Sequence, residues 1–323
     1  MLQETVNRLR PFLPLNDIYI SSNEEYAGEI KKELPDLPEK NIILEPLRRE
    51  RFAAILLFLA SVGEKGRKEP ILILPSDHLI KNREEFRQAV LDGENFIKKN
   101  RDYILLLGEK PTFPDTGLGY IEKGKILGSW GQSKIYDIPF FKEKPNLKRA
   151  ENFMRSGRHF WNTGIYILTP ALIMEATRNF VPNNYERYKK IARSVGKKDF
   201  KKILEKEYSA MDQVSLEYSI IEKYKKNALL PKSFGWSDVG SWAVLKNCLT
   251  APNENFIKGN HIGIDSKNIM VYGREDKLVA TVGIKDLIIA VNDDIVLVCH
   301  KNDSQKVKRI IEKLEKDKNL RYL

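Results

Sequence analysis

The sequence predicts an α/β fold: a doubly wound domain with a mixed, mostly parallel sheet, followed by a small β-rich domain. Two observations support this prediction. In the first 250 residues, short apolar runs alternate with amphipathic stretches, which is the order of strands and helices in such a sheet. Beyond about residue 250 the amphipathic stretches give way to closely spaced, short apolar runs, which indicates a β-rich module.

The alternation is clearest at the start of the chain. The run Ile71–Leu74 is wholly apolar, as a parallel strand that is buried on both faces should be. The other expected elements, strands and helices in turn, are a strand at Asp17–Ser21, a helix near 24–33, a strand at Asn41–Leu44, a helix at about 49–62, a helix around 83–99 and a strand at Tyr103–Leu107.

The second domain is expected to begin where the pattern changes. Ala251–Asn253 marks this point, so we divide the chain into residues 1–250 and 251–323. The spacing of the later apolar runs suggests a small sheet or a β-helix-like module, closed by a basic helix at Ser304–Lys316. Its expected strands are Ile262–Asp265, Ile269–Gly273, Leu278–Val282, Leu287–Val291 and Ile295–Val298.

Charge and composition narrow the classes of partner. A net charge of +11 would suit an anionic partner, so nucleic acid must be considered. The lysines, however, occur in pairs interleaved with acids on helical segments, and we find no RNA- or DNA-binding motif. We therefore expect a solvated basic surface and no nucleic-acid partner, while phosphorylated small molecules stay open.

Location and metal chemistry are also constrained. We see no apolar run near the roughly 18 residues of a membrane span and no signal-peptide pattern, so we expect a cytoplasmic protein without a membrane partner. Cys248 and Cys299 lie far apart and indicate neither a disulfide framework nor a zinc site. His78 and His159 likewise lack the spacing of a metal-binding pair.

Two acidic residues stand where a ligand site is expected. Asp77 follows the run Ile71–Leu74, and Asp238 lies between small residues and two tryptophans in Trp236–Trp242. In α/β sheets, ligands bind beyond the carboxyl ends of the strands. Mg²⁺ is typically held by one or two carboxylates together with substrate phosphates. Asp77 and Asp238 are therefore candidate magnesium ligands.

Four further segments are candidates for ligand binding, and each also has an ordinary structural explanation. Two glycines in Thr116–Ile121 would let backbone approach a ligand closely, or form a simple turn. Phe141–Pro145 offers a lysine for a phosphate and a glutamate for sugar hydroxyls, or is a solvated edge strand. Phe160–Tyr166 is a polyol-binding patch or a turn around a buried tryptophan. Glu45–Arg51 serves phosphate or base recognition, or is a solvated helix start.

In this order and spacing, the segments together resemble the mannose-1-phosphate guanylyltransferases, within the sugar-nucleotide pyrophosphorylase superfamily. The most specific matches are Trp161–Gly164 and Trp236–Trp242. The resemblance covers nearly the whole chain. Its other matching segments are Met1–Val6, Ile43–Pro46, Leu74–His78, Thr116–Ile121, Phe141–Pro145, Val214–Lys223, Asp286–Val291 and Val307–Lys308.

The resemblance implies a Rossmann-like nucleotidyltransferase domain followed by a short β-rich domain. The implied reaction converts GTP and mannose 1-phosphate into GDP-mannose and pyrophosphate, which is the step that makes GDP-mannose. Independently of the resemblance, a homodimer is left open as the assembly of the chain. The sugar phosphate is already a nucleophile at neutral pH, so no catalytic base is required. What the enzyme must supply is positive charge around the α-phosphorus and the leaving pyrophosphate.

The same resemblance implies roles for individual residues. Asp77 and Asp238 would hold Mg²⁺ and, with Lys144, carry the catalysis. The residues that bind the substrates would come from the four candidate segments described above. These are Arg49, Gly119, Tyr120, Glu143, Asn162, Thr163 and Gly164.

Two departures from the family pattern leave alternatives open. Family members begin with a strand and a glycine-rich phosphate-binding loop, and Met1 aligns just after that loop. Within Glu45–Ala54, Arg51 stands where the family has a threonine. Three alternatives therefore stay open. The chain is a truncated copy of an active enzyme, or it is a non-catalytic relative that binds sugar nucleotide or regulates a partner. In the third alternative it is a pyrophosphorylase of different nucleotide or sugar specificity.

Overall fold

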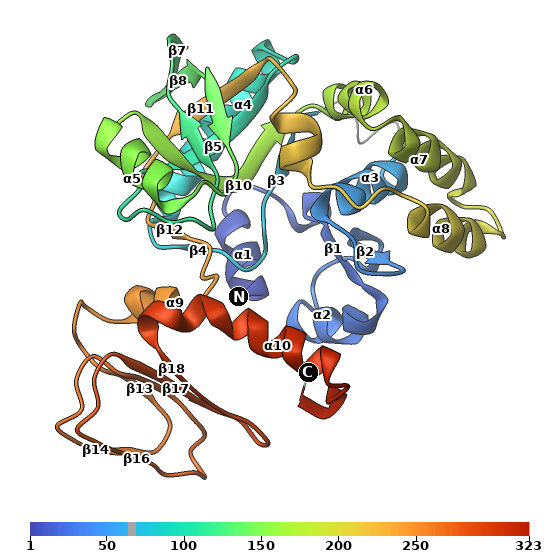
Figure 1. Ribbon diagram of the computed structural model, residues 1–323. Coiled ribbons are helices and arrows are strands. Elements are labelled where there is room, and N and C mark those ends of the chain that lie inside the picture. The colour runs from blue at the N-terminus through green and yellow to red at the C-terminus, as the bar shows by residue number, and fades with distance from the viewer. Residues whose placement is uncertain (64–68, 323) are drawn as a thin grey trace. The chain divides into compact units, whose positions relative to one another are not determined.

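Strand β10 (His159–Leu168) organises the main sheet of the computed structural model, which describes residues 1–63 and 69–322 (Figure 1). It pairs with three neighbours: β3, β5 and β6. The chain divides into two compact units, Met1–Trp236 and Ser237–Leu323, which are described separately below. Division of the sequence near residue 250 remains a prediction.

The main sheet of the first unit has eight strands in the order β7–β8–β11–β5–β10–β6–β9, with β3 paired to β10. It is a mixed sheet, as expected, but its pairings are mainly antiparallel: within the described residues, β11 with β5 is the parallel pair. The pair β7–β8 has a simple cause, because a link of two residues can join only antiparallel strands. The bounds are β3 (Ile71–Ile73), β5 (Ile104–Glu109), β6 (Tyr120–Glu122), β7 (Ile126–Trp130), β8 (Ser133–Asp137), β9 (Phe140–Lys142) and β11 (Asn227–Pro231).

Strand β5 shows why the first unit is a layered α/β structure. All six of its residues are buried. Because successive side chains point to opposite faces, Ile104 and Leu106 join the hydrophobic cluster on one face, and Leu105 and Leu107 join the cluster on the other. The continuous apolar run that predicted a buried strand is therefore the signature of a sheet with cover on both faces.

Helices supply that cover. Helix α4 (Arg83–Lys99) packs its apolar face in the cluster that contains Leu105, while α3 (Arg51–Ser61) packs in the cluster that contains Ile104. The expected helix at 83–99 is confirmed, and the side chain of Asn82 caps it by accepting a hydrogen bond from the Glu85 amide. The other helices of this unit are α1 (Leu2–Leu9), α2 (Ala27–Glu33), α5 (Leu147–Ser156), α6 (Pro170–Phe180), α7 (Pro182–Ser194) and α8 (Phe200–Ser209).

A separate parallel pair precedes α3. Strands β1 (Ile20–Asn23) and β2 (Ile42–Glu45) pair with Ile20 opposite Ile42. Both lie within about three residues of the positions that the sequence predicted. Two further strands, β4 (Leu79–Ile80) and β12 (Trp236–Ser237), are only two residues long.

The second unit is a wound β module. Strands β13, β15 and β17 lie side by side in parallel, and β14 pairs in parallel with β16. Parallel neighbours from successive turns of the chain are what a β-helix-like module predicts, and Ile269, Val271 and Ile289 form its core. The bounds are α9 (Trp242–Leu249), β13 (Phe256–Lys258), β14 (His261–Ile264), β15 (Met270–Tyr272), β16 (Val279–Val282), β17 (Leu287–Val291), β18 (Val296–His300) and α10 (Val307–Lys316).

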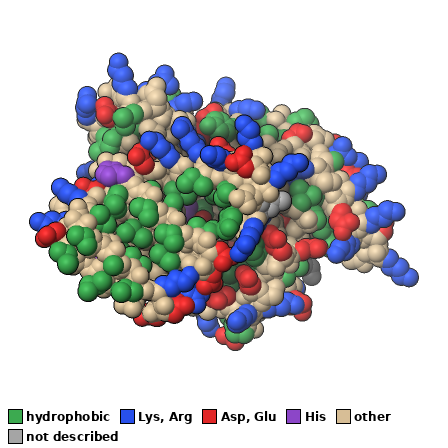
Figure 2. Space-filling model, turned by 60° about the horizontal axis from the view of Figure 1, so that its bottom comes forward, with side chains coloured by type: hydrophobic (Ala, Val, Ile, Leu, Met, Phe, Trp, Pro, Cys, Tyr) green, Lys and Arg blue, Asp and Glu red, His purple; other side chains and the backbone are tan. Residues whose placement is uncertain are grey.

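The outer side of this module is unusually apolar. Figure 2 shows hydrophobic side chains gathered over one broad area of the surface. Among the exposed side chains of the module, Val282 is 70% and Val296 66% exposed, and Ile262, Ile264, Leu278 and Val298 are exposed as well. Across the described residues, none of the helices combines the length and apolar character that crossing a bilayer requires.

Candidate functional site

The predicted sugar-binding residues come together at the β9, β6 and β10 strands. The amide of Asn162 donates to the carbonyl of Gly119 at 2.8 Å. Glu143 follows β9 and points at the same spot, because a Cβ atom on Gly119 would overlap the Oε2 of Glu143 and lie 3.2 Å from Asn162 Cβ. Three segments that are far apart in the sequence therefore converge, and glycine at 119 is what leaves room for the carboxylate.

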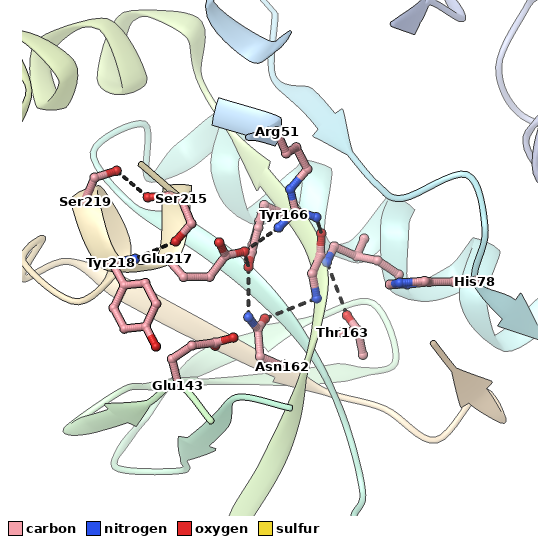
Figure 3. Close-up of polar contacts among 12 residues, drawn as sticks. Arg51, His78, Glu143, Asn162, Thr163, Tyr166, Ser215, Glu217, Tyr218 and Ser219 are labelled. Carbon is pink, nitrogen blue, oxygen red and sulfur yellow. Dashed lines mark hydrogen bonds and ion pairs between the residues drawn. The ribbon is translucent and has the colours of Figure 1, made fainter. Parts of the chain in front are cut away.

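A chain of polar side chains lies behind Asn162 (Figure 3). The Nδ2 of Asn162 donates to the Tyr166 hydroxyl at 2.8 Å, and that hydroxyl donates to Glu217 Oε1 at 2.7 Å. Glu217 in turn forms an ion pair with Arg51, whose Nη1 donates to the carbonyl of Gly164 at 3.0 Å. Burial raises the pKa of Tyr166 well above its ordinary value, and the charge of Glu217 adds to the effect. The tyrosine is thus a fixed neutral hydroxyl.

Glu143 is the group in this cluster with an open acceptor. Its side chain is 13% exposed, and its Oε2 is buried without a hydrogen-bond partner among the described residues. In Figure 3 its carboxylate faces Asn162 and Glu217. Burial, followed by the negative charge of Glu217, raises the pKa of Glu143 to about 7. A buried acceptor without a donor costs free energy, so this oxygen is suited to receive a hydroxyl from a ligand.

Lys144 provides a cation at the edge of the cluster. Its backbone has a φ of 45°, its side chain is 61% exposed, and its Nζ lies 4.0 Å from Glu143 Oε1. An exposed ammonium beside a buried carboxyl matches a ligand that carries hydroxyls and a phosphate.

Asp77 lies on an exposed turn of the first unit, after β3. Its carboxylate is 74% exposed, and His78 Nε2 is 3.9 Å from its Oδ1. Asp238 belongs to the second unit, where its Oδ1 accepts from the Gly240 amide at 3.2 Å and the next residue, Val239, has a φ of 49°. Both carboxylates therefore stand on tight turns rather than inside regular elements.

The donor chemistry at these two turns fits Mg²⁺. Within the ranges 1–63 and 69–322, we find no group of three or more His, Cys, Asp or Glu side chains placed to hold a metal. Mg²⁺ does not need such a group, because it commonly takes one or two carboxylates and completes its shell with water and substrate phosphates. The exposed, hard oxygen atoms of Asp77 meet that requirement.

The remaining predicted residues are placed differently. Thr163 is fully buried and its hydroxyl donates to the Leu107 carbonyl at 2.7 Å, so it supports the sheet. Tyr120 is buried opposite Trp161 in the β6–β10 pairing, and its hydroxyl donates to the Asp115 carbonyl. Arg49 donates to the Ser209 carbonyl, and no described hydrogen bond or ion pair joins it to the Glu143 cluster. Their roles in substrate binding remain predictions.

Three members of the cluster were not among the predicted site residues: Arg51, Tyr166 and Glu217. A signal for Tyr166 is present in the sequence, because Asn162, Gly164 and Tyr166 alternate along one strand and alternate residues share a face. Glu217 stands on a short helix, Glu217–Ile221. Its pairing with Arg51 joins residues 166 positions apart, which no local pattern reveals.

Two family models match this chain, one after the other. The family model described as "Nucleotidyl transferase" matches residues 1–251, and the one described as "MannoseP isomerase/GMP-like beta-helix domain" matches residues 259–314. A mannose-1-phosphate guanylyltransferase 2 of Escherichia coli is 32% identical, over 100% of this chain and 68% of its own length. The mannose-1-phosphate guanylyltransferase ManC of Salmonella typhimurium is 31% identical, over 98% of this chain and 66% of its own length.

Two solved structures superpose on much of this chain. A structure described as a mannose-1-phosphate geranyltransferase from Thermus thermophilus superposes with a TM-score of 0.84 at 28% identity, over 97% of this chain and 89% of that one. A mannose-6-phosphate isomerase from Helicobacter pylori superposes with a TM-score of 0.60 at 19% identity, over 73% of this chain and 89% of that one, and shows a shared fold alone. The chain spans about two thirds of the length of the two sequence relatives.

Proposed function

We propose that this chain, which belongs to the nucleotidyl transferase family and groups with its mannose-1-phosphate guanylyltransferases, transfers a guanylyl group from GTP to mannose 1-phosphate. The products are GDP-mannose and pyrophosphate. Membership of the family makes the chain a nucleotidyltransferase; the identity of both substrates and the use of Mg²⁺ belong to the proposal.

The observation that carries the proposal is the Glu143 cluster. A buried, unpartnered carboxyl oxygen faces Asn162 beside the backbone of Gly119, and the exposed Lys144 is next to it. A carboxyl acceptor suits vicinal sugar hydroxyls, and a neighbouring ammonium suits the phosphate of a sugar phosphate. These groups therefore support binding of a ligand that carries both hydroxyls and a phosphate.

These contacts support the following reaction. A phosphate oxygen of the sugar phosphate attacks the α-phosphorus of the nucleotide, the bond to the β-phosphate oxygen breaks, and pyrophosphate leaves. Glu143 and Asn162 orient the sugar, so that its phosphate is held near Lys144, which opposes the charge that gathers during the attack. Mg²⁺, held by Asp77 and Asp238 and by the phosphates, would supply further positive charge.

Pyrophosphate release tests this function directly. Purified protein, GTP, mannose 1-phosphate and Mg²⁺ should release pyrophosphate in proportion to enzyme, and omission of either substrate should abolish the signal. A panel of nucleotides and sugar phosphates then fixes the specificity. A folded sample that releases no pyrophosphate with any pair would contradict nucleotidyl transfer. Binding of GDP-mannose in the same sample, measured by calorimetry, would then support the alternative, a non-catalytic binder of sugar nucleotides.

Two further expectations belong to the proposal. On the sequence grounds given above, we place the reaction in the cytoplasm. We also expect a homodimer, because monomers rarely expose as many neighbouring aliphatic side chains as Ile262, Ile264 and Val282 provide on the β module. Light scattering on a Val282→Glu variant tests this: loss of a wild-type dimer supports it, and a wild-type monomer rules it out.

A further inference from the structure

The turn that carries Asp77 is held on both sides by residues from helix α1. Thr5 Oγ1 donates to the carbonyl of Ser76 at 3.0 Å, and Arg8 Nη2 donates to the carbonyl of His78 at 3.3 Å. Arg8 is 4% exposed and lies over the ring of Phe86. The backbone that flanks Asp77 is thus fixed, while the carboxylate itself is 74% exposed.

The His78 ring is fixed by a residue far along the chain. Its side chain is 14% exposed, and the Nε1 of Trp236 donates to its Nδ1 at 3.0 Å. The two rings also pack edge to face, with centroids 5.2 Å apart and an angle of 81° between planes. Because an indole N–H can only donate, Nδ1 must accept, and a neutral imidazole then carries its proton on Nε2.

The Nε2 atom is the one that faces Asp77. It lies 3.9 Å from Asp77 Oδ1, which is too long for a direct hydrogen bond but short enough for a bridging water or a small rotation of an exposed side chain. The hydrogen bond from Trp236 therefore directs a donor toward the carboxylate. Trp236 is the last residue of the first unit, so the indole, the imidazole and the Asp77 carboxylate all belong to that unit.

We propose that His78 is a positioning residue for the Asp77 carboxylate, oriented for that task by the indole N–H of Trp236. The inference rests on the proposed function, in which Asp77 holds Mg²⁺. Residues that hydrogen-bond a metal-binding carboxylate fix its orientation, and their loss commonly weakens metal affinity by about 10- to 100-fold. His78 acts without touching the metal or the substrates.

A purely structural role for His78 makes a different prediction. If the ring only fills space against Trp236, any aromatic side chain of similar shape should serve. If its Nε2–H matters, a donor at that position should serve even without the ring. His78→Phe keeps the aromatic packing and removes the donor, whereas His78→Gln removes the ring and keeps an N–H at about the same reach. The two variants therefore separate the two roles.

The first measurement needs no metal. The ¹⁵N shifts of the imidazole nitrogens distinguish the two neutral tautomers, and the chain has 4 histidines to assign. We expect His78 to carry its proton on Nε2 in the wild type and to populate both tautomers in Trp236→Phe. A wild-type His78 with its proton on Nδ1 would overturn the proposal.

The second measurement is the dissociation constant of Mn²⁺ in the presence of GTP, read from the EPR signal of free Mn²⁺. His78→Phe should weaken it at least about tenfold, and His78→Gln should stay within about threefold of the wild type. The dissociation constant of Trp236→Phe should lie between those of the two His78 variants. If His78→Phe does not fold, Trp236→Phe takes its place in the test. His300→Gln, at an exposed histidine of the second unit, is the control.

Asp77→Asn separates the two hypotheses. If Asp77→Asn leaves Mn²⁺ affinity unchanged, the metal site of the proposed function is wrong. If Asp77→Asn weakens binding while His78→Phe equals the wild type, the metal site stands and the role of His78 is refuted.

Discussion

Replacing Glu143 by glutamine should stabilise the protein at alkaline pH and leave it unchanged in acid. The folded protein raises the pKa of Glu143 from 4.5 to about 7, chiefly through burial. Between these two values the folded state holds a proton that the unfolded state has released. Stability is therefore complete below about pH 4.5 and falls as the pH rises through 7. Glutamine does not ionise and escapes this loss.

The structure sets the size of the effect. At about 1.36 kcal/mol per pKa unit, the shift corresponds to about 3 kcal/mol, of which about 2 kcal/mol should develop between about pH 5 and pH 8. Because the Glu143 side chain is only 13% exposed, solvent should screen little of it. The same substitution should weaken sugar binding, since glutamine offers one acceptor oxygen where a carboxylate offers two.

Urea unfolding of both proteins at a series of pH values measures this difference. The free energy of unfolding of Glu143→Gln should exceed that of the wild type by an amount that grows with pH. Glu205→Gln, at an exposed carboxylate on α8, should show no such trend. An equally flat difference for Glu143→Gln would refute the burial of an uncompensated carboxyl. Pyrophosphate release should show a raised KM for mannose 1-phosphate in Glu143→Gln, with the KM for GTP unchanged.

Three further predictions address other parts of the site. Asp238→Asn should lower kcat by more than about 100-fold, because metal ions supply several kcal/mol of charge stabilisation; near-normal turnover would exclude its role. Gly119→Ala should raise the KM for mannose 1-phosphate about tenfold, since the new Cβ displaces the carboxyl of Glu143, whereas Gly28→Ala, with open space around it, should not. A double-mutant cycle of Arg51→Met and Glu217→Gln should give a coupling of about 1–3 kcal/mol, and additive losses would exclude the pair.

Local patterns in the sequence predicted the elements of this fold well. The alternation of apolar runs and amphipathic stretches predicted the helix at 83–99 and strand β5. The direction of the strands was not predictable in the same way. Four short strands lie between Tyr120 and Lys142. The sequence patterns in this region indicated ligand-binding segments but did not indicate which strands pair. Strand direction depends on pairing between segments that are far apart in the sequence. The prediction of a mostly parallel sheet was therefore wrong for the main sheet of the first unit.

The candidate site shows the same limit. The segments Thr116–Ile121, Phe141–Pro145 and Phe160–Tyr166 were each predicted separately as ligand-binding segments. Each of them could also be explained by an ordinary structural role. They become one site because β6 pairs with both β9 and β10, which sets Tyr120 opposite Lys142 and Trp161. Register of this kind is fixed by the whole sheet. The sequence could therefore name Gly119, Glu143 and Asn162 as candidates, but could not show that they lie side by side.

Arg51 bears on whether the chain is an enzyme or a decayed relative. It stands where the family pattern has a threonine, and its side chain is only 31% exposed. An unpaired charge at such a position would cost several kcal/mol. Here Glu217 pairs with it, the Gly164 carbonyl accepts from it, and Tyr166 links the pair to Asn162. Burial lowers the pKa of Arg51, but Tyr166 and Glu217 more than offset this and raise it overall.

A protein that has lost its catalytic function accumulates substitutions at the former site without compensating changes in neighbouring residues, because nothing selects for such changes. The Arg51–Glu217 pair is compensated, and it supports the residues that face the open oxygen of Glu143. This favours an altered but working site over a degenerate one. If that reasoning is correct, Arg51→Thr should restore the family residue and yet lower kcat/KM, because Glu217 would lose its cation. Arg51→Lys should retain more activity than Arg51→Thr; equal activity of the two variants would show that the pair is not needed for function.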